Sequence, residues 1–213
     1  ERFKTELITN VSHDIKTPLT SIINYVDLIK KEGISEEKVR EYVEVLDRQS
    51  ARLKKLIEDL LEASKASTGN VEMHMEACDA AVMISQVVGE YQDKLQAQDI
   101  EIVVNEAKNP ANIMADGRHL WRVFDNIMSN ICKYTQDHTR VYVNVEDAGD
   151  QVRMIFKNIS KYPLNISSDE LMERFVRGDA SRNTEGHGLG LSIASSLTAL
   201  MDGQLTIDID GDL

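Results

Sequence analysis

The sequence predicts an α+β protein in which a two-helix hairpin precedes a domain of helices packed on a β-sheet. Through the first 66 residues, apolar side chains recur every three or four positions, which is typical of helices that pack against other helices. After residue 71, short β-branched runs alternate with longer helical stretches. We therefore expect a helical hairpin at 1–66, a linker at 67–71 and an α/β sandwich at 72–213.

Two periodic series define the hairpin. They run through Ile8, Val11, Ile15, Leu19, Ile22, Val26 and Ile29, and then through Val39, Val43, Leu46, Leu53, Ile57 and Leu60. Gly33 favours a helix end, and Ser35 followed by Glu36 is typical of an N-cap. Two helices share a single seam, so a further apolar strip stays open. Because two hairpins paired into a four-helix bundle would cover that strip, we expect a homodimer.

The second domain is expected to hold a largely antiparallel sheet. The predicted strands are Ile100–Val104, Val141–Val145, Val152–Phe156 and Leu205–Ile209, and the predicted helices are about 79–97, 117–134 and 189–200. Between the last two helices, residues 160–186 form a polar stretch with three arginines. A loop of that length inside a compact domain is usually functional.

Composition and charge exclude several classes of protein. The chain has 213 residues, of which 42% are hydrophobic and 28% charged, as in ordinary globular proteins. The net charge is −12, and residues 71–213 carry 12 basic and 23 acidic side chains. A nucleic-acid partner is therefore not expected, because such proteins present a basic face. No apolar run reaches the ~20 residues of a membrane-spanning helix. The two cysteines lack C-x-x-C spacing, so neither a disulfide framework nor a zinc site is indicated.

Segment 12–19 reads SHDIKTPL and places a histidine in the first predicted helix. His13 faces away from the seam, and Thr17 follows one turn later on the same exposed face. Pro18 removes the hydrogen bond to the carbonyl group of Asp14 and should kink the helix there, at a cost of about 3 kcal/mol. A protein that needed only a stable helix would avoid that residue. The alternative is that His13 is an incidental surface histidine.

Segment 125–134 reads DNIMSNICKY and is expected to be helical. On a helix, Asn126, Asn130, Lys133 and Tyr134 share one face. The opposite face is apolar and consists of Leu120, Val123, Phe124, Ile127 and Ile131. Core packing explains the apolar face without any ligand. Two amides aligned with a lysine are nevertheless unusual for a solvated face. Asn side-chain oxygens can bind Mg²⁺, and the lysine supplies a positive charge for phosphate.

Three glycines, Gly186, Gly188 and Gly190, precede the last predicted helix. Glycines before a helix N-terminus let backbone N–H groups approach a phosphate. A dinucleotide-binding fold is the obvious alternative, but its fingerprint should follow a strand, whereas this one follows the arginine-containing loop. A glycine-rich turn without function is the other alternative.

Together and in this order, these motifs resemble the catalytic core of bacterial sensor histidine kinases. The resemblance implies a dimerisation and phosphotransfer hairpin followed by a nucleotide-binding domain of the GHKL ATPase type. The segment around His13 matches the phosphoacceptor box, and the polar residues of segment 125–134 match the asparagine box. Phe175 matches the phenylalanine box, and the three glycines match the second glycine box.

The family resemblance implies a role for each residue of the phosphoacceptor box. His13 would attack the γ-phosphate of ATP and then pass the phosphoryl group to an aspartate of a response regulator protein. Asp14 would hold the other imidazole nitrogen and favour the nucleophilic tautomer. Thr17 would help place a water molecule that dephosphorylates the regulator. Kinase and phosphatase activities are thus both implied.

The resemblance also implies how ATP and Mg²⁺ are held. Asn130 would bind Mg²⁺. Lys133 and one of the loop arginines, Arg177 or Arg182, would meet the triphosphate oxygens. These cations matter because the negative charge of the domain would otherwise repel ATP.

One part of the family pattern is replaced. The first glycine box, an Asp followed by spaced glycines, should follow the strand Val152–Phe156, where this chain has KNISKYP. Asn158 stands in place of the Asp and can accept a hydrogen bond from the adenine amino group. It lacks the charge, and both glycines are absent, which bears on ATP affinity and base selectivity.

Two other functions remain open. The first is a phosphatase or scaffold without kinase activity and with a degenerate nucleotide site. The second is a GHKL-type chaperone or mismatch-repair ATPase with an incidental helical hairpin, which would hydrolyse ATP without forming a phosphohistidine. The resemblance further implies the cytoplasmic portion of a membrane-bound sensor, with any membrane contact made by segments absent from this chain.

Overall fold

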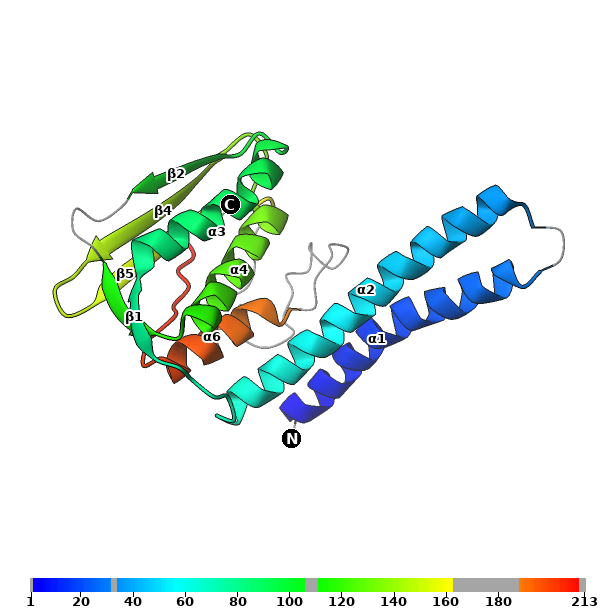
Figure 1. The fold of residues 1–213 in the computed structure, drawn as a ribbon, viewed down its shortest axis with the longest axis horizontal. Coiled ribbons are helices and arrows are strands. Elements are labelled where there is room, and N and C mark those ends of the chain that lie inside the picture. The colour runs from blue at the N-terminus through cyan, green and yellow to red at the C-terminus, as the bar shows by residue number, and fades with distance from the viewer. Residues whose placement is uncertain (1, 32–33, 106–110, 163–187, 211–213) are drawn as a thin grey trace. The chain divides into compact units, whose positions relative to one another are not determined.

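Figure 1 shows a helical hairpin and an α/β domain. They are two compact units, Glu1–Ser64 and Lys65–Leu213. The structure is a computed structural model. It describes residues 2–31, 34–105, 111–162 and 188–210, with the backbone alone for 2–13 and 67.

The hairpin consists of α1 (Arg2–Ile29) and α2 (Glu36–Ser67). α1 continues through Pro18 without interruption. The predicted N-cap is confirmed, because the Ser35 Oγ accepts a hydrogen bond from the Lys38 backbone N–H at 3.4 Å. Near the connection, the rings of Tyr25 and Tyr42 pack across the hairpin with their centroids 5.3 Å apart.

Among the hairpin side chains that the structure describes, five large apolar ones are exposed, and we call them the outer strip. They are Leu19 (43% exposed), Ile23 (53%), Val43 (50%), Ile57 (45%) and Leu61 (56%). The periodicity predicted that Leu19, Val43 and Ile57 lie in the seam between the two helices. That prediction is wrong for a single hairpin, because all three side chains are exposed. The apolar stripe of each helix is wider than one neighbouring helix can cover, so seam residues such as Leu56 are buried while the outer strip is not.

The second unit is an α/β domain, which confirms the predicted fold class. Its elements are β1 (Glu76–Asp79), α3 (Ala80–Gln96), β2 (Glu101–Asn105), β3 (Asn112–Ala115), α4 (Gly117–Tyr134), β4 (Arg140–Asp147), β5 (Val152–Lys157) and α6 (Gly190–Leu200). β1 pairs with β3 antiparallel; in the other sheet, of order β2-β4-β5, the first pair is parallel and the second antiparallel. The helices α3, α4 and α6 lie on one face of the larger sheet (Figure 1).

The core lies between the larger sheet and these helices. Val141, Val143 and Val145 alternate with exposed or half-exposed neighbours along β4 and are buried, as period-two patterning requires. The rings of Phe124 on α4 and Phe156 on β5 lie 6.1 Å apart and join helix to sheet. This packing fixes α4, the helix with the asparagine motif, over the sheet.

Strand assignment differs from the prediction in two ways. The predicted strand Leu205–Ile209 is wrong, because the described backbone there belongs to no sheet. Its apolar side chains do alternate, being half-buried at every second position. Alternation selects an extended backbone, but a strand also needs a hydrogen-bonded partner. Conversely, β1 and β3 were not predicted; each has only four residues, and their pairing depends on a distant segment.

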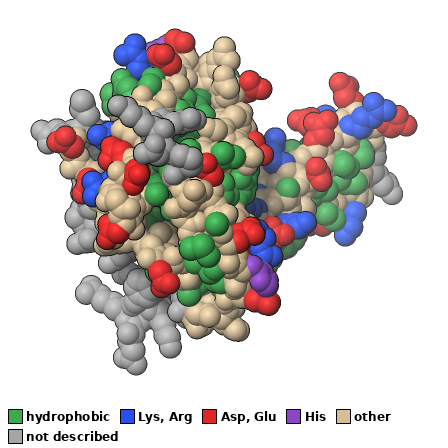
Figure 2. Space-filling view, turned by 60° about the vertical axis from the view of Figure 1, so that its left-hand side comes forward, with side chains coloured by type: hydrophobic (Ala, Val, Ile, Leu, Met, Phe, Trp, Pro, Cys, Tyr) green, Lys and Arg blue, Asp and Glu red, His purple; other side chains and the backbone are tan. Residues whose placement is uncertain are grey.

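Some charged groups on this domain form ion pairs with groups distant in sequence. Arg140 Nε lies 2.8 Å from Glu101 Oε2 across the β4–β2 pair, and Lys161 Nζ lies 2.9 Å from Asp137 Oδ1. Figure 2 shows acidic and basic side chains interspersed over the face that it draws. Such exposed pairs contribute little to stability. The Arg140–Glu101 pair joins residues that lie opposite each other in β4 and β2, which agrees with the register of that pair.

Candidate nucleotide and phosphotransfer site

The phosphoacceptor motif lies within α1. Asp14 is half-buried, Thr17 is exposed and Pro18 is fully buried. The side chain of His13 is outside the described part, so its expected outward orientation stays a prediction. The backbone nevertheless places His13 and Thr17 one helical turn apart.

The asparagine motif is carried by α4, whose N-terminus is held by Asp116. This side chain is 3% exposed and accepts hydrogen bonds from the backbone N–H groups of His119 at 3.1 Å and His74 at 2.8 Å. Burial by itself would raise the pKa of Asp116, but these N–H groups stabilise the carboxylate and hold its pKa below the ordinary value. Asp116 is therefore a helix cap that also ties α4 to the segment before β1.

One side of α4 is buried in the core, although the buried set differs slightly from the prediction. It consists of Leu120, Val123, Phe124, Met128 and Ile131. Ile127, expected on the apolar face, is half-exposed, and Met128 is fully buried instead. α4 packs against both α3 and α6, so its buried stripe is wider than a single face.

The glycine motif and the asparagine motif meet at the start of α6. A Cβ atom added to Gly190 would lie 3.4 Å from the Asn126 Oδ1, so the two residues are in contact. Gly188 has φ +67°, a conformation that favours glycine. The Asn126 Nδ2 is buried and has no hydrogen-bond partner among the described residues. A buried donor without a partner fits a site whose acceptor is supplied by a ligand.

Asn130 and Lys133 follow Asn126 on α4 at intervals of one and two turns. Asn130 is half-exposed, Lys133 is exposed and Tyr134 is half-exposed, so all three can be reached from solvent. An amide oxygen and an ammonium group near the Asn126–Gly190 contact suit Mg²⁺ and phosphate respectively. Phe175, Arg177, Arg182 and Gly186 lie outside the described residues.

The segment that replaces the first glycine box is bonded to the end of α4. The backbone N–H of Gln136 donates to the Ile159 carbonyl at 2.9 Å, and that of Lys161 donates to the Tyr134 carbonyl at 2.7 Å. Thr135 and Ser160 form an antiparallel bridge between them. Residues 159–161 therefore act as a short extended strap across the end of the asparagine motif.

Asn158 itself is exposed. It lines an open depression of about 1120 Å³ together with residues of α3, β2 and β4, among them Gln92, Glu101 and Tyr142. The lining of that depression includes neither Asn126 nor Gly190. The structure thus brings Gly190 of the second glycine box and Asn126 of the asparagine box together, whereas Asn158 lines a depression to which neither of them contributes.

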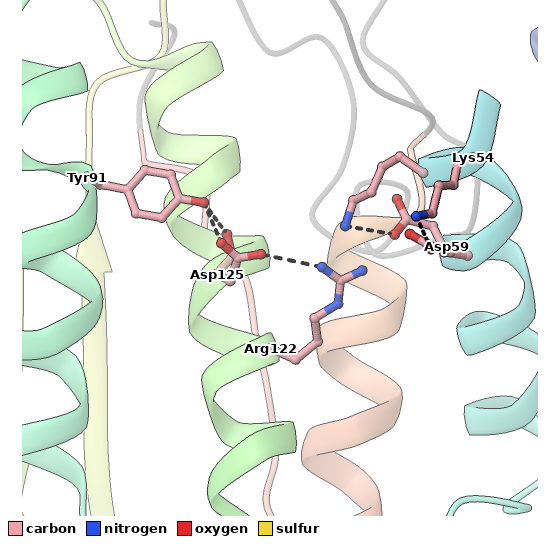
Figure 3. Close-up of polar contacts among 7 residues, drawn as sticks. Lys54, Asp59, Tyr91, Arg122 and Asp125 are labelled. Atoms are coloured by element: carbon pink, nitrogen blue, oxygen red, sulfur yellow. Dashed lines mark hydrogen bonds and ion pairs between the residues drawn. The ribbon is translucent and has the colours of Figure 1, made fainter. Parts of the chain in front are cut away.

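A buried polar contact between α3 and α4 was missed by the sequence analysis. The hydroxyl of Tyr91, which is 8% exposed, donates to the Asp125 Oδ1 at 2.5 Å, and Arg122 Nη1 lies 3.4 Å from the Asp125 Oδ2 (Figure 3). The available signal was the acidic residue immediately before Asn126. Its partner could not be found, because it comes from another helix.

Comparison with known proteins assigns both units. Residues 3–69 match the His Kinase A (phospho-acceptor) domain. Residues 115–211 match the family described as histidine kinase-, DNA gyrase B- and HSP90-like ATPase. The first match separates this chain from a gyrase-like or chaperone-like ATPase, because the hairpin belongs to a phosphoacceptor family. The chain carries the catalytic core of a histidine kinase.

Curated relatives extend over nearly all of this histidine kinase core. The sensor protein VanS of Enterococcus faecium is 29% identical over 208 residues, which cover 96% of this chain and 54% of VanS. The sensor protein kinase WalK of Staphylococcus aureus is 27% identical over 211 residues, covering 96% of this chain and 50% of WalK. The chain thus spans about half the length of the curated relatives that it matches.

A solved structure shares the fold of the kinase core. Histidine kinase ThkA, in complex with the response regulator protein TrrA, superposes with a TM-score of 0.71 at 21% identity, covering 97% of this chain and 58% of that chain. Within the described residues, none of the helices has both the length and the apolar character required to cross a membrane.

Proposed function

We propose that this core is an ATP-dependent protein-histidine kinase of a two-component signalling system. The observation that carries the proposal is the contact of Gly190 with Asn126, whose own side-chain Nδ2 is buried and has no hydrogen-bond partner among the described residues. It supports a nucleotide site where α4 meets α6, in a chain that also presents a phosphoacceptor hairpin.

In the proposed reaction, the His13 Nε2 attacks the γ-phosphorus of ATP. An N–P bond forms, the bond from phosphorus to the β,γ-bridging oxygen breaks, and ADP leaves with that electron pair. Asp14 accepts a hydrogen bond from Nδ1–H, which keeps the lone pair on Nε2 and stabilises the positive charge that develops on the ring. The phosphoryl group then passes from Nε2 to an aspartate oxygen of a response regulator.

On the nucleotide side, Asn126 and Asn130 would bind polar groups of Mg-ATP, with Asn130 as the Mg²⁺ ligand. When bound, Mg²⁺ supplies neutralisation of the negative charge on the phosphates. Lys133 adds a cation, and the backbone N–H groups after Gly188 and Gly190 face phosphate at the N-terminus of α6. We extend the proposal to Tyr134, Phe175, Gly186 and one of Arg177 or Arg182 from the resemblance alone.

We propose that the core works as a homodimer through its hairpins and that its partner is a response regulator. The outer strip supports the dimer, because five large apolar side chains would otherwise face water. The structural neighbour ThkA is described in complex with a response regulator, which supports that class of partner. We also place this portion on the cytoplasmic side of a membrane-bound sensor, where ATP is available.

A second candidate is a core that removes phosphate from its regulator and does not autophosphorylate. The strap at residues 159–161 favours it, because this segment is bonded to α4 where the family pattern has spaced glycines. In that case Thr17, exposed and one turn from His13, would place the attacking water.

Incubation with Mg²⁺ and ATP radiolabelled on the γ-phosphate separates the two candidates. The kinase gives an acid-labile, base-stable phosphoprotein; His13→Gln abolishes the label, and His74→Gln, which changes an exposed histidine elsewhere, keeps it. Label retained by His13→Gln refutes the acceptor assignment. A wild type that binds ATP without taking label, yet dephosphorylates a regulator, establishes the second candidate instead.

A further inference from the structure

Tyr91 joins α3 to α4 by a hydrogen bond from a nearly buried phenol. Its hydroxyl lies 2.5 Å from the Asp125 Oδ1 and 3.3 Å from the carbonyl oxygen of the same residue. Arg122 approaches the other carboxylate oxygen from one turn earlier on α4 (Figure 3). Both donors therefore converge on one carboxylate, immediately before Asn126 in the chain.

The phenol is protonated at neutral pH and therefore acts as a hydrogen-bond donor to Asp125. Burial, followed by the contact with Asp125, raises the pKa of Tyr91 well above its ordinary value. The ammonium group of Lys94 lies 4.8 Å from the centroid of the Tyr91 ring, on the same helix, and helps to hold the ring in place.

The position of Asp125 on α4 links this bond to the nucleotide site. Asn126 is the next residue, about 100° further round the helix, and Asn130 follows one turn later. A hydrogen bond weakens steeply with distance and angle, so this contact restricts the rotation of α4 about its axis more narrowly than apolar contacts alone do. A rotation of about 20° would move a side-chain amide some 5 Å from the axis by about 2 Å. Displacements of that size are large on the scale of binding and catalysis.

We propose that Tyr91 is a positioning residue that sets the rotation of α4 through Asp125 and so places Asn126 and Asn130 for Mg-ATP. This inference rests on the proposed function. Without the hydrogen bond, α4 samples several rotational settings, of which a fraction presents the amides correctly beside Gly190. The apparent dissociation constant for nucleotide then rises in inverse proportion to that fraction.

The first test is Tyr91→Phe, which removes one oxygen and keeps the buried ring. We expect the dissociation constant for Mg-ATP, measured by calorimetry on the whole chain, to rise about five- to tenfold. The matched control is Ile84→Val, also on the buried face of α3 and 1% exposed, which loosens packing without touching the pair. We expect this control to lower thermal stability and to leave the dissociation constant within about twofold of wild type.

A double-mutant cycle separates positioning from loss of stability. Asp125→Leu should weaken binding as much as Tyr91→Phe, and the double variant should be no weaker than either single variant. Asp125→Asn retains an acceptor oxygen for the phenol and should recover most of the affinity lost in Asp125→Leu. Recovery of affinity in Asp125→Asn without a matching recovery of thermal stability does not follow if the pair matters only for folding.

The outcomes are distinct. Wild type that binds Mg-ATP, with Tyr91→Phe within about twofold of it, overturns the positioning role and leaves the kinase assignment intact. Equal weakening in Tyr91→Phe and Ile84→Val also overturns it, because affinity would then follow stability. A wild-type chain that binds no Mg-ATP overturns the proposed function, and this inference with it.

Discussion

Replacing Asp116 by alanine tests how the helix with the asparagine motif is anchored. The substitution removes the N-cap bond from His119 N–H, which is worth about 1 kcal/mol. It also removes the bond from His74 N–H to a charged acceptor, worth about 1.5–3 kcal/mol. We therefore expect Asp116→Ala to lower the free energy of unfolding by about 2.5–4 kcal/mol, measured by urea denaturation with helix content as the probe.

Asp79→Ala is the matched control for this substitution. Asp79 caps α3 by accepting from the backbone N–H groups of Ala81 and Val82, without a partner distant in sequence. We expect a loss of about 1 kcal/mol for Asp79→Ala. Equal losses in the two variants would refute the reasoning, because the extra cost of Asp116→Ala is assigned to the link with His74.

The same substitution has a pH signature of known sign. Because the pKa of Asp116 is lower in the folded protein than its ordinary value of 3.8, its charged form stabilises the fold above that value. This contribution disappears as the pH falls through the lower, folded pKa. The difference in stability between wild type and Asp116→Ala should therefore be constant above about pH 5 and shrink below about pH 4. A difference that grew on acidification would contradict the assignment.

Two further predictions follow from exposure and packing. Ile23→Glu in the outer strip should shift the sedimentation coefficient from that of a dimer to that of a monomer. Val82→Glu, which changes a side chain on α3 that is 52% exposed, should leave the dimer intact. A dimer that survives Ile23→Glu would count against the hairpin interface. Gly203→Ala should destabilise the protein by about 1–3 kcal/mol, because its Cβ would lie 2.9 Å from Thr198 Cγ2. Gly89→Ala, in the middle of α3 with nothing within 4 Å of the added Cβ, should stabilise the protein by up to about 1 kcal/mol. Shifts of the same sign for both variants in thermal unfolding would contradict this reasoning.

Periodic elements were predictable from the sequence because their pattern is local. The predicted helix 117–134 has the observed bounds, because its apolar face is periodic over these residues and the flanking residues Asp116 and Thr135 have an extended backbone. β4 and β5 were found for the same reason. β1 and β3 were not, because each has only four residues, two of them exposed, and becomes a strand only through pairing with a distant segment. Leu205–Ile209 is the opposite case, because its side chains alternate in burial as predicted but its backbone is not paired with another strand.

The candidate site shows the same difference between local features, which the sequence predicts, and contacts between distant segments, which it does not. The motif positions could be read from the chain, and the contact between Gly190 and Asn126 agrees with their proposed joint role. The partner of Asp125 could not be read, because Tyr91 precedes it by 34 residues and reaches it only in the folded domain. The strap at 159–161 was likewise visible only as an absence of glycines until the backbone placed it against α4.

These contacts have a common structural effect, because hydrogen bonds to three different segments hold the start, the middle and the end of α4. Asp116 holds its start to the chain before β1, Tyr91 holds its middle to α3, and the strap holds its end. A domain with a strong excess of acidic side chains repels ATP at long range, so binding depends on a few amides and cations placed at short range. If the amides of α4 bind Mg-ATP as proposed, the rigidity of α4 is part of nucleotide recognition, and the proposed role of Tyr91 in positioning those amides follows from it.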